Sequence, residues 1–425
     1  MSVLKEEILD GKGFRIHVVQ ADQFKTNTLV FKMKAPLNRE DITIRALLPY
    51  VLQASTEKFP TTTKLRSYLD ELYGTGLFVD LGKKGEYHVI TFSVDIANEK
   101  FLKDQTPLLE KAFELLSDIL LKPLAKNGAF DSQTVEQEKR TLKQRIQAVN
   151  DDKMRYAGVR LVEEMCKEEP YSLPLNGFKE DVDAITPESL YQYFQRAFAE
   201  DELDLYVVGD VELDRVQNFA DQWLQFENRE PKQIERRSSK NPSEVKEVKE
   251  PQNVKQGKLN IGYRTNVLYG DEDYYAFQVM NGILGGFSHS KLFINVREKA
   301  SLAYYAASRL ESHKGLLLIM TGIDMQNYDQ TVAIVKEQVQ AMQNGDFTEQ
   351  EIAQTKAVIR NQLLETVDTP RGMTEVLYHN VVAKKNIVLN EWLEKTERVT
   401  KDEIVSTAKK LQLDTIYFLT GKEQA

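Results

Sequence analysis

The pattern of apolar and polar positions along the chain predicts helices that alternate with strands. Residues 290–304 place Leu292, Phe293 and Val296 at helical spacing before a charged step of Arg, Glu and Lys. Apolar runs of strand character are expected at 88–94 and 315–320, as well as near 28–34 and 259–264. Strands interleaved with long helices indicate an α+β fold, in which each half of the chain forms a mixed β-sheet with helices packed on one face.

The two halves of the chain repeat one order of elements. Residues 63–70 correspond to 290–297, and each segment is followed by a strand, a turn and a second apolar run. Further on, 130–139 opens a charged helix in the first half as 347–356 does in the second. Because this order recurs over nearly the whole chain, we interpret it as the duplication of one unit of mixed helix and strand.

A change in composition separates the two halves. Residues 226–256 are rich in Lys, Glu, Ser and Pro and nearly free of large apolar side chains, which is typical of a linker. The predicted organisation is therefore a first half at 1–225, a charged linker at 226–256 and a second half at 257–425.

Composition excludes several classes of function. The 425 residues carry a formal net charge of −9, which argues against sequence-independent binding of nucleic acid. The sequence has a polar N-terminus and no uninterrupted apolar stretch of about 18 residues, so we expect a cytoplasmic protein without a membrane partner. Cys166 is the single cysteine, which excludes an intrachain disulfide and a cysteine-rich metal site. With no nearby His to activate it, Cys166 is interpreted as a buried helix residue.

Several segments together resemble the insulinase-like zinc peptidases, which include pitrilysin and the mitochondrial processing peptidases. The first half carries KLRSYLDELYG, VEQEK, YSLPLNGF, TPESL and VVGD, and the second half carries LGGFSHSKLFINVREKASLAY. The resemblance thus covers both halves and implies that family's fold.

The zinc motif of active members is absent from the matching helix. The resemblance implies His-x-x-Glu-His there, with two imidazoles on one helix face as zinc ligands and a Glu that polarises water. The matching positions are Ala46, Pro49 and Tyr50. Ala46 has only a methyl group, Pro49 has neither a carboxylate nor a backbone N–H, and the phenol of Tyr50 is a poor zinc ligand at neutral pH. No histidine occurs anywhere in 41–58.

Other positions of the family site also differ. The third zinc ligand of the family matches Glu138, which without partners is interpreted as a surface or helix-pairing carboxylate. A second family Glu falls at Arg145, which reverses the charge. An Asn-Ala pair on the strand that binds substrate in the family is replaced by Phe78 and Val79.

The histidines do not suggest a metal site. None of the five stands at ligand spacing from another, so each is interpreted as an ordinary surface or strand residue; they are His17, His88, His289, His313 and His379. We expect no cofactor in this chain, with zinc only in a partner subunit.

The second half keeps the pair that complements zinc subunits in the heterodimeric bacterial members of the family. The resemblance assigns Arg297 and Tyr304, seven residues apart, to a site shared with the partner. A guanidinium is suited to hold a peptide carbonyl or carboxylate, and a phenol to donate to an oxyanion. The implied function is a non-catalytic subunit, inactive alone, that forms a chamber for short peptides with a zinc-bearing homologue.

Two alternatives stay open. The chain could be a stand-alone peptide-binding or structural protein that has lost peptidase function, with Arg297 and Tyr304 as fold contacts or relics. A homodimer could also replace the heterodimer.

Overall fold

A computed structural model describes residues 4–103, 106–227, 229–234 and 241–422. The chain forms two compact units, each built from segments of both halves of the sequence. Unit 1 comprises the described residues of Met1–Ala148, Leu173–Glu235 and Val367–Val376, and unit 2 those of Val149–Ser172, Arg236–Thr366 and Leu377–Ala425.

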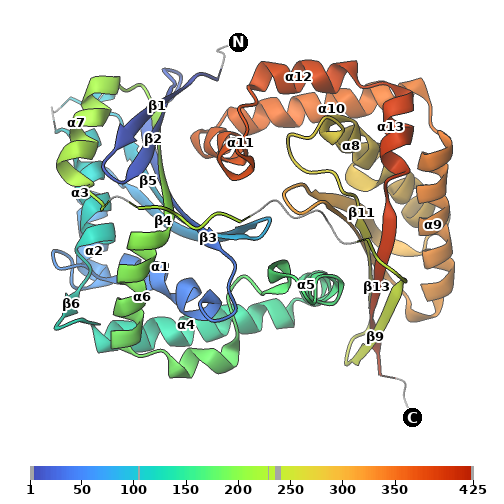
Figure 1. Cartoon of the computed structure of the whole chain (residues 1–425), viewed down its shortest axis with the longest axis horizontal. Helices are drawn as coiled ribbons and strands as arrows, with labels where there is room; N and C mark the ends of the chain where they lie inside the picture. The colour runs from blue at the N-terminus through green and yellow to red at the C-terminus, as the bar shows by residue number, and fades with distance from the viewer. Residues whose placement is uncertain (1–3, 104–105, 228, 235–240, 423–425) are drawn as a thin grey trace. The chain divides into compact units, whose positions relative to one another are not determined.

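Unit 1 contains a mixed β-sheet with the strand order β1-β2-β8-β3-β5-β4 (Figure 1). Its strands are β1 (Glu6–Gly11), β2 (Phe14–Gln20), β3 (Thr26–Pro36), β4 (Gly76–Lys84), β5 (Tyr87–Ala97) and β8 (Glu202–Gly209), and a small separate pair is formed by β6 (Ala125–Lys126) and β7 (Ala129–Phe130). Its helices are α1 (Ile42–Ala54), α2 (Thr62–Glu71), α3 (Leu108–Leu121), α4 (Ser132–Asp151), α6 (Pro187–Glu200) and α7 (Leu213–Trp223), with short turns η1 (Glu99–Phe101) and η3 (Lys179–Ala184).

Unit 2 contains a second mixed sheet, with the order β11-β12-β10-β13-β9. Its strands are β9 (Lys246–Gln252), β10 (Gly257–Arg264), β11 (Ala303–Glu311), β12 (Leu316–Ile323) and β13 (Gln412–Gly421). Its helices are α5 (Lys153–Met165), α8 (Tyr274–Asn281), α9 (Tyr328–Asn344), α10 (Glu349–Val367), α12 (Leu389–Arg398) and α13 (Lys401–Ala408), with short turns η2 (Pro170–Ser172), η4 (Gly282–Gly286), η5 (Phe293–Lys299) and η6 (Met325–Asn327). Helix α11 (Pro370–Ala383) begins in unit 1 and ends in unit 2.

The two sheets share one topology, and this confirms the expected α+β class with two similar halves. Starting at the edge strand β4, the first sheet has three antiparallel pairings followed by the parallel pairing of β8 with β2. Starting at the edge strand β11, the second sheet likewise has three antiparallel pairings followed by the parallel pairing of β13 with β9. Strand β9 therefore takes the place of β2. The expectation that all of 226–256 is a linker is wrong for residues 246–252, because this charged segment forms an edge strand.

Alternation along the strands gives each sheet two different faces. In β3, Leu29, Phe31 and Met33 are fully buried against α1 and α3, while the intervening Lys32 and Lys34 point to the opposite face. The described helices of unit 1 thus build its main core on one face, as expected.

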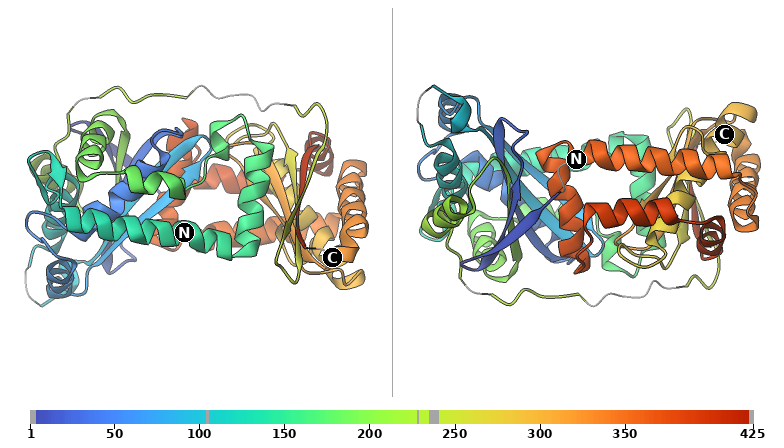
Figure 2. Two further views of the ribbon diagram at one scale, coloured as in Figure 1. Left: turned by 90° about the horizontal axis from the view of Figure 1, so that it is seen from below. Right: turned by 90° about the horizontal axis from the view of Figure 1, so that it is seen from above.

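The other face of each sheet contacts a helix that comes from the other half of the sequence. In unit 1, Glu375 at the start of α11 pairs with Lys32 at 2.7 Å and with Lys84 at 2.9 Å. In unit 2, α5 packs on β10, where a Cβ on Gly262 would stand 2.6 Å from the Sδ atom of Met165. Figure 2 shows α5 on one side of this sheet and α9 and α13 on the other. Among the described residues, no helix is long and apolar enough to cross a membrane.

Candidate functional site

Helix α1 carries the three positions that the resemblance assigns to the zinc motif. Ala46 is fully buried in the core of unit 1, and Pro49 is buried inside the helix, where it has no N–H to donate to the carbonyl of Arg45. Tyr50 follows as a half-buried side chain. The three motif positions lie on one helix, as the resemblance implies. Their side chains do not include an effective metal ligand.

Helix α4 supplies the other side of this site. Glu138 and Arg145 lie seven residues apart and so share one helix face. The guanidinium carbon of Arg145 stands 3.3 Å from the ring centroid of Tyr50, a cation–π contact between α4 and α1. Its Nη1 atom is buried and has no hydrogen-bond acceptor among the residues that the structure describes.

The electrostatics of this cluster are set by burial and by Arg145. Burial raises the pKa of Glu138, and the Arg145 cation offsets part of that rise. Burial likewise raises the pKa of the Tyr50 phenol, an effect that Arg145 opposes and that Asp80 and Glu138 reinforce. Glu138, which we interpreted as a surface carboxylate, is therefore half-buried beside a cation.

This set of residues does not fit zinc. A zinc site needs neutral imidazoles, thiolates or carboxylates converging on one point, whereas here a guanidinium occupies the face of Tyr50. Within the described ranges, no group of three or more His, Cys, Asp and Glu is arranged to hold a metal ion.

Strand β4 runs beside α1 at the end of the unit 1 sheet. The Gln53 amide of α1 donates to the Leu77 carbonyl of β4 at 3.2 Å. Phe78 and Val79 lie on this strand; Phe78 is 48% exposed, and the guanidinium of Arg371 covers its ring at 4.1 Å. The position that carries a polar residue in the family thus presents an aromatic surface here.

Arg297 and Tyr304 both lie on the surface of unit 2. Arg297 is exposed at the end of η5, where its guanidinium stands 4.5 Å from the Phe293 ring centroid. Tyr304 is 79% exposed at the start of β11, within a bulge that shifts the pairing register between Ala303 and Ala306. Within the described part of the chain, neither side chain has a hydrogen-bond or ion-pair partner.

The turn before η5 holds these elements close together. Gly285 lies in η4, where a Cβ would stand 2.8 Å from the backbone nitrogen of Ser308 in β11 and 2.7 Å from Leu292. Glycine is needed here for close approach of the backbone rather than for binding phosphate.

Four of the histidines are not the isolated residues that their sequence spacing suggested. His313 and His379 stack and share a ring-nitrogen contact of 2.6 Å in unit 2, a pairing across 66 positions that no local pattern reveals. His17 is buried between Glu6 and Asp204. His88 is buried against Arg45, and burial together with that cation lowers its pKa to about 3.

Cys166 lies buried just after α5. Burial raises the pKa of its thiol to about 12, so the thiol stays protonated and weakly nucleophilic near neutral pH. Its burial agrees with the interpretation from the sequence, although Cys166 follows the last residue of the helix rather than lying within it.

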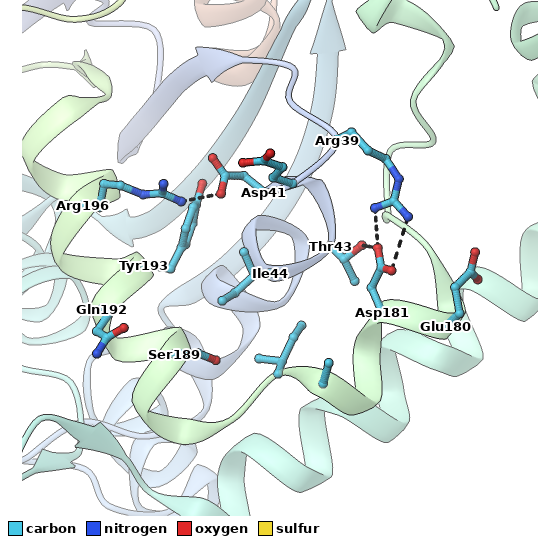
Figure 3. Close-up of a pocket in the computed structure, with 13 residues that line it drawn as sticks. Arg39, Asp41, Thr43, Ile44, Glu180, Asp181, Ser189, Gln192, Tyr193 and Arg196 are labelled. Atoms are coloured by element: carbon cyan, nitrogen blue, oxygen red, sulfur yellow. Dashed lines mark hydrogen bonds and ion pairs between the residues drawn. The ribbon is translucent and has the colours of Figure 1, made fainter.

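A hollow lies at the start of α1, facing η3 and α6, with a volume of about 680 Å³ (Figure 3). Arg39 binds Asp181 through two nitrogen–oxygen contacts of 2.6 and 3.3 Å, and Arg196 pairs with Asp41. Each guanidinium already has a carboxylate partner, which argues against an anion site in this hollow.

Comparison with known proteins gives one consistent family. Residues 184–359 match the family described as "Peptidase M16 inactive domain". The whole chain is 56% identical over 425 residues to the "Probable inactive metalloprotease YmfF" of Bacillus subtilis, with all of both chains covered. A crystal structure of a conserved protein from Enterococcus faecalis matches at 33% identity with a TM-score of 0.93, covering 99% of each chain. A peptidase M16 inactive domain from Pseudomonas fluorescens shares the fold at 15% identity and a TM-score of 0.81, again over 99% of each chain.

Proposed function

The chain belongs to the M16 family of insulinase-like metallopeptidases, and we propose that it is a non-catalytic subunit that completes the peptidase site of a zinc-bearing homologue. In this pair the homologue contributes the zinc helix, and this chain contributes one wall of a chamber for short peptides. The isolated chain then binds no stoichiometric zinc and cleaves no peptide.

The observation that carries the proposal is the replacement of the zinc site. Ala46 and Pro49 are buried and have no side-chain atom that could ligate a metal ion. The guanidinium carbon of Arg145 lies 3.3 Å from the ring centroid of Tyr50. A fixed positive charge at this place opposes a divalent cation, so hydrolysis by the family's metal chemistry has to come from another chain.

The exposure of Arg297 and Tyr304 supports a role toward another molecule. A guanidinium and a phenol that serve the fold are usually hydrogen-bonded within it, yet both side chains are exposed, and one is presented by a strand bulge. Their donor groups suit a peptide carbonyl and a developing oxyanion.

Reconstitution tests the proposal. The purified chain is mixed with a homologue that carries His-x-x-Glu-His, and zinc-dependent cleavage of quenched fluorescent peptides is measured for each chain alone and for the mixture. We expect activity only in the mixture, and a loss of roughly 100-fold or more in kcat/KM for Arg297→Ala or Tyr304→Phe, the size seen when an oxyanion donor is removed.

Matched controls are available beside both residues. Lys299→Ala removes a neighbouring exposed cation, and Tyr305→Phe removes the next phenol, whose ring packs against Gly322; both variants should retain activity. If no zinc-bearing homologue binds and the chain still binds peptides, the alternative of a stand-alone peptide-binding protein is favoured. Zinc-dependent cleavage by the isolated chain would contradict both the complementing-subunit hypothesis and the stand-alone alternative.

A further inference from the structure

A second hollow lies within unit 2 and has a volume of about 420 Å³. Small-molecule sites in proteins span roughly 300–1,000 Å³, so this hollow is large enough for a small ligand. Residues of α8, α10, α12 and β11 line it, together with one side chain of α11. The lining residues that determine its chemistry are Tyr274, Gln278, Asn281, Gly286, His379 and Trp392.

Aromatic rings that hold one another in place form one side of the hollow. Tyr274 meets Trp392 edge-on at a centroid distance of 5.8 Å, and both rings contact the buried Tyr269, at 5.1 and 5.5 Å. His379 stacks on Tyr269 at 5.1 Å. Because the rings of Tyr274 and Trp392 are buried and packed against this cluster, they form a preorganised surface on which a flat ring can stack.

Two carboxamides on α8 supply the hydrogen-bond donors of the hollow. Trp392 Nε1 donates to Gln278 Oε1 at 2.8 Å, and Ser308 Oγ donates to Asn281 Oδ1 at 2.7 Å. Both amide oxygens are therefore occupied, whereas neither amide nitrogen has a hydrogen-bond partner among the residues that the structure describes. Since Gln278 and Asn281 are three residues apart on one helix face, the two free donor groups are neighbours.

The charges around the hollow favour an uncharged ligand. Among the described residues no Asp or Glu lines it, and Arg309 and His379 are the lining side chains that can carry a charge near neutral pH. Arg309 already pairs with Glu311 at 3.2 Å, and a ring nitrogen of His379 lies 2.6 Å from one of His313. The hollow thus has no carboxylate for a cationic ligand, and its guanidinium already has an acidic partner.

We propose that this hollow binds a small uncharged heteroaromatic molecule of the nucleobase type, with its ring stacked on the aromatic side and two adjacent acceptor atoms facing the amide nitrogens of Gln278 and Asn281. An oxopurine has that edge in O6 and N7, whereas adenine places an N6 amino donor beside N7. The formal net charge of −9 favours a free base or nucleoside over a nucleic acid. This inference goes beyond the proposed function and requires no zinc-bearing homologue.

The fluorescence of Trp392 gives a direct test in the full-length chain. The sequence has two tryptophans, so Trp223→Phe leaves Trp392 as the one source of indole emission. Inosine and adenosine are titrated as uncharged probes, and the quenching is corrected for their absorbance. We expect saturable quenching by inosine and binding of adenosine that is weaker by roughly 10-fold or more, because the adenosine amino group would face an amide N–H.

Replacing a donor by an acceptor should change the preference between the two nucleosides. Asn281→Asp keeps the oxygen that accepts from Ser308 and replaces the amide nitrogen by a second oxygen, so inosine should bind roughly 10-fold more weakly and adenosine should gain relative to inosine. A Cβ at Gly286 would stand 3.1 Å from Asn281 Nδ2, so Gly286→Val should weaken the binding of both nucleosides. Gln354→Glu makes the same change of charge at an exposed amide of α10 outside the hollow and should leave both affinities unchanged.

A second measurement needs no substitution at the hollow. The indole ¹⁵N–H resonance of Trp392, whose N–H donates to Gln278, should shift when inosine is added to the chain. No saturable response to inosine up to roughly 10 mM by either method overturns the inference, and so does equal affinity for inosine and adenosine. If inosine monophosphate binds far more tightly than inosine, recognition of an uncharged ligand is wrong. If a short single-stranded oligonucleotide binds and the nucleosides do not, a site for the free base is wrong.

Discussion

Restoring the residue types of the zinc motif should not restore zinc binding while Arg145 remains. The perturbation is the triple variant Ala46→His, Pro49→Glu and Tyr50→His, which places two imidazoles and a carboxylate on α1 opposite Glu138. Replacing Pro49 also returns a backbone N–H to the helix interior, whereas Ala46→His adds a ring at a fully buried position, a cost shared by all of the variants compared.

The size of the effect follows from the position of the guanidinium. Because the Arg145 Cζ atom stands 3.3 Å from the Tyr50 ring centroid, a metal held at residue 50 would lie within roughly 4–6 Å of the positive charge. Two unit charges at about 4 Å repel by about 4 kcal/mol at an effective dielectric of about 20, and a divalent ion doubles this. Solvent at the half-buried site and movement of the arginine reduce the penalty to roughly 3–4 kcal/mol, which is about 100- to 1,000-fold in Kd.

The assay is competition for Zn²⁺ with a chromophoric chelator at neutral pH. The triple variant with Arg145→Gln added should bind zinc at least about 100-fold more tightly than the triple variant alone, and raised salt should narrow the difference. Adding Arg140→Gln instead is the matched control and should change little. Equal zinc affinity with and without Arg145 would refute the electrostatic reasoning.

Three further predictions concern stability. Gly285→Ala should lower the free energy of unfolding of unit 2 in urea by about 1–3 kcal/mol, because the new Cβ meets the backbone of β11. The control Gly158→Ala, in open space on α5, should be neutral or stabilising by up to about 1 kcal/mol, and equal effects of the two substitutions would contradict the packing argument. Arg264→Met removes a buried guanidinium that binds Asp414 at 2.9 Å and Glu169 at 2.6 Å. The substitution should lower the free energy of unfolding by about 3–5 kcal/mol and speed amide hydrogen exchange in α5. Unchanged exchange in α5 would contradict a stabilising role for these ion pairs. The pKa of His88 is about 3 in the folded chain, so below about pH 6.5 the unfolded chain binds a proton that the folded chain does not. The free energy of unfolding should therefore fall by about 1.4 kcal/mol per pH unit between about pH 6.5 and pH 3. His88→Gln should flatten the plot of unfolding free energy against pH in this range.

The sequence was informative where function depends on local spacing. The repeated order of elements predicted the two similar sheets, and the resemblance placed Ala46, Pro49 and Tyr50 on one helix and Glu138 on another. Strand β9 was missed because an edge strand with polar side chains on both faces has no apolar alternation; its Glu250 instead accepts hydrogen bonds from Tyr156 and Tyr417. Its backbone pairs in parallel with β13, and the hydrogen bonds to the Glu250 side chain add to that pairing.

Long-range pairings could not be predicted from one sequence. Lys32 meets Glu375 across 343 positions, and this contact depends on a helix from the second half joining the sheet of the first. The change from Glu to Arg at position 145 was visible, but the contact of Arg145 with Tyr50 was not. Seven-residue spacing puts Arg145 on the face of Glu138, and only the packing of α4 against α1 brings that face to Tyr50.

The contact between Arg145 and Tyr50 explains how this site remains ordered without a metal. In a zinc site, ligands from two helices are held together by one shared ion; here one side chain from α1 and one from α4 hold each other directly. An exposed cation–π pair contributes only about 0.5–1 kcal/mol and a desolvated one about 2, far less than a structural zinc, so the pair adds to a junction that the surrounding core of unit 1 already forms.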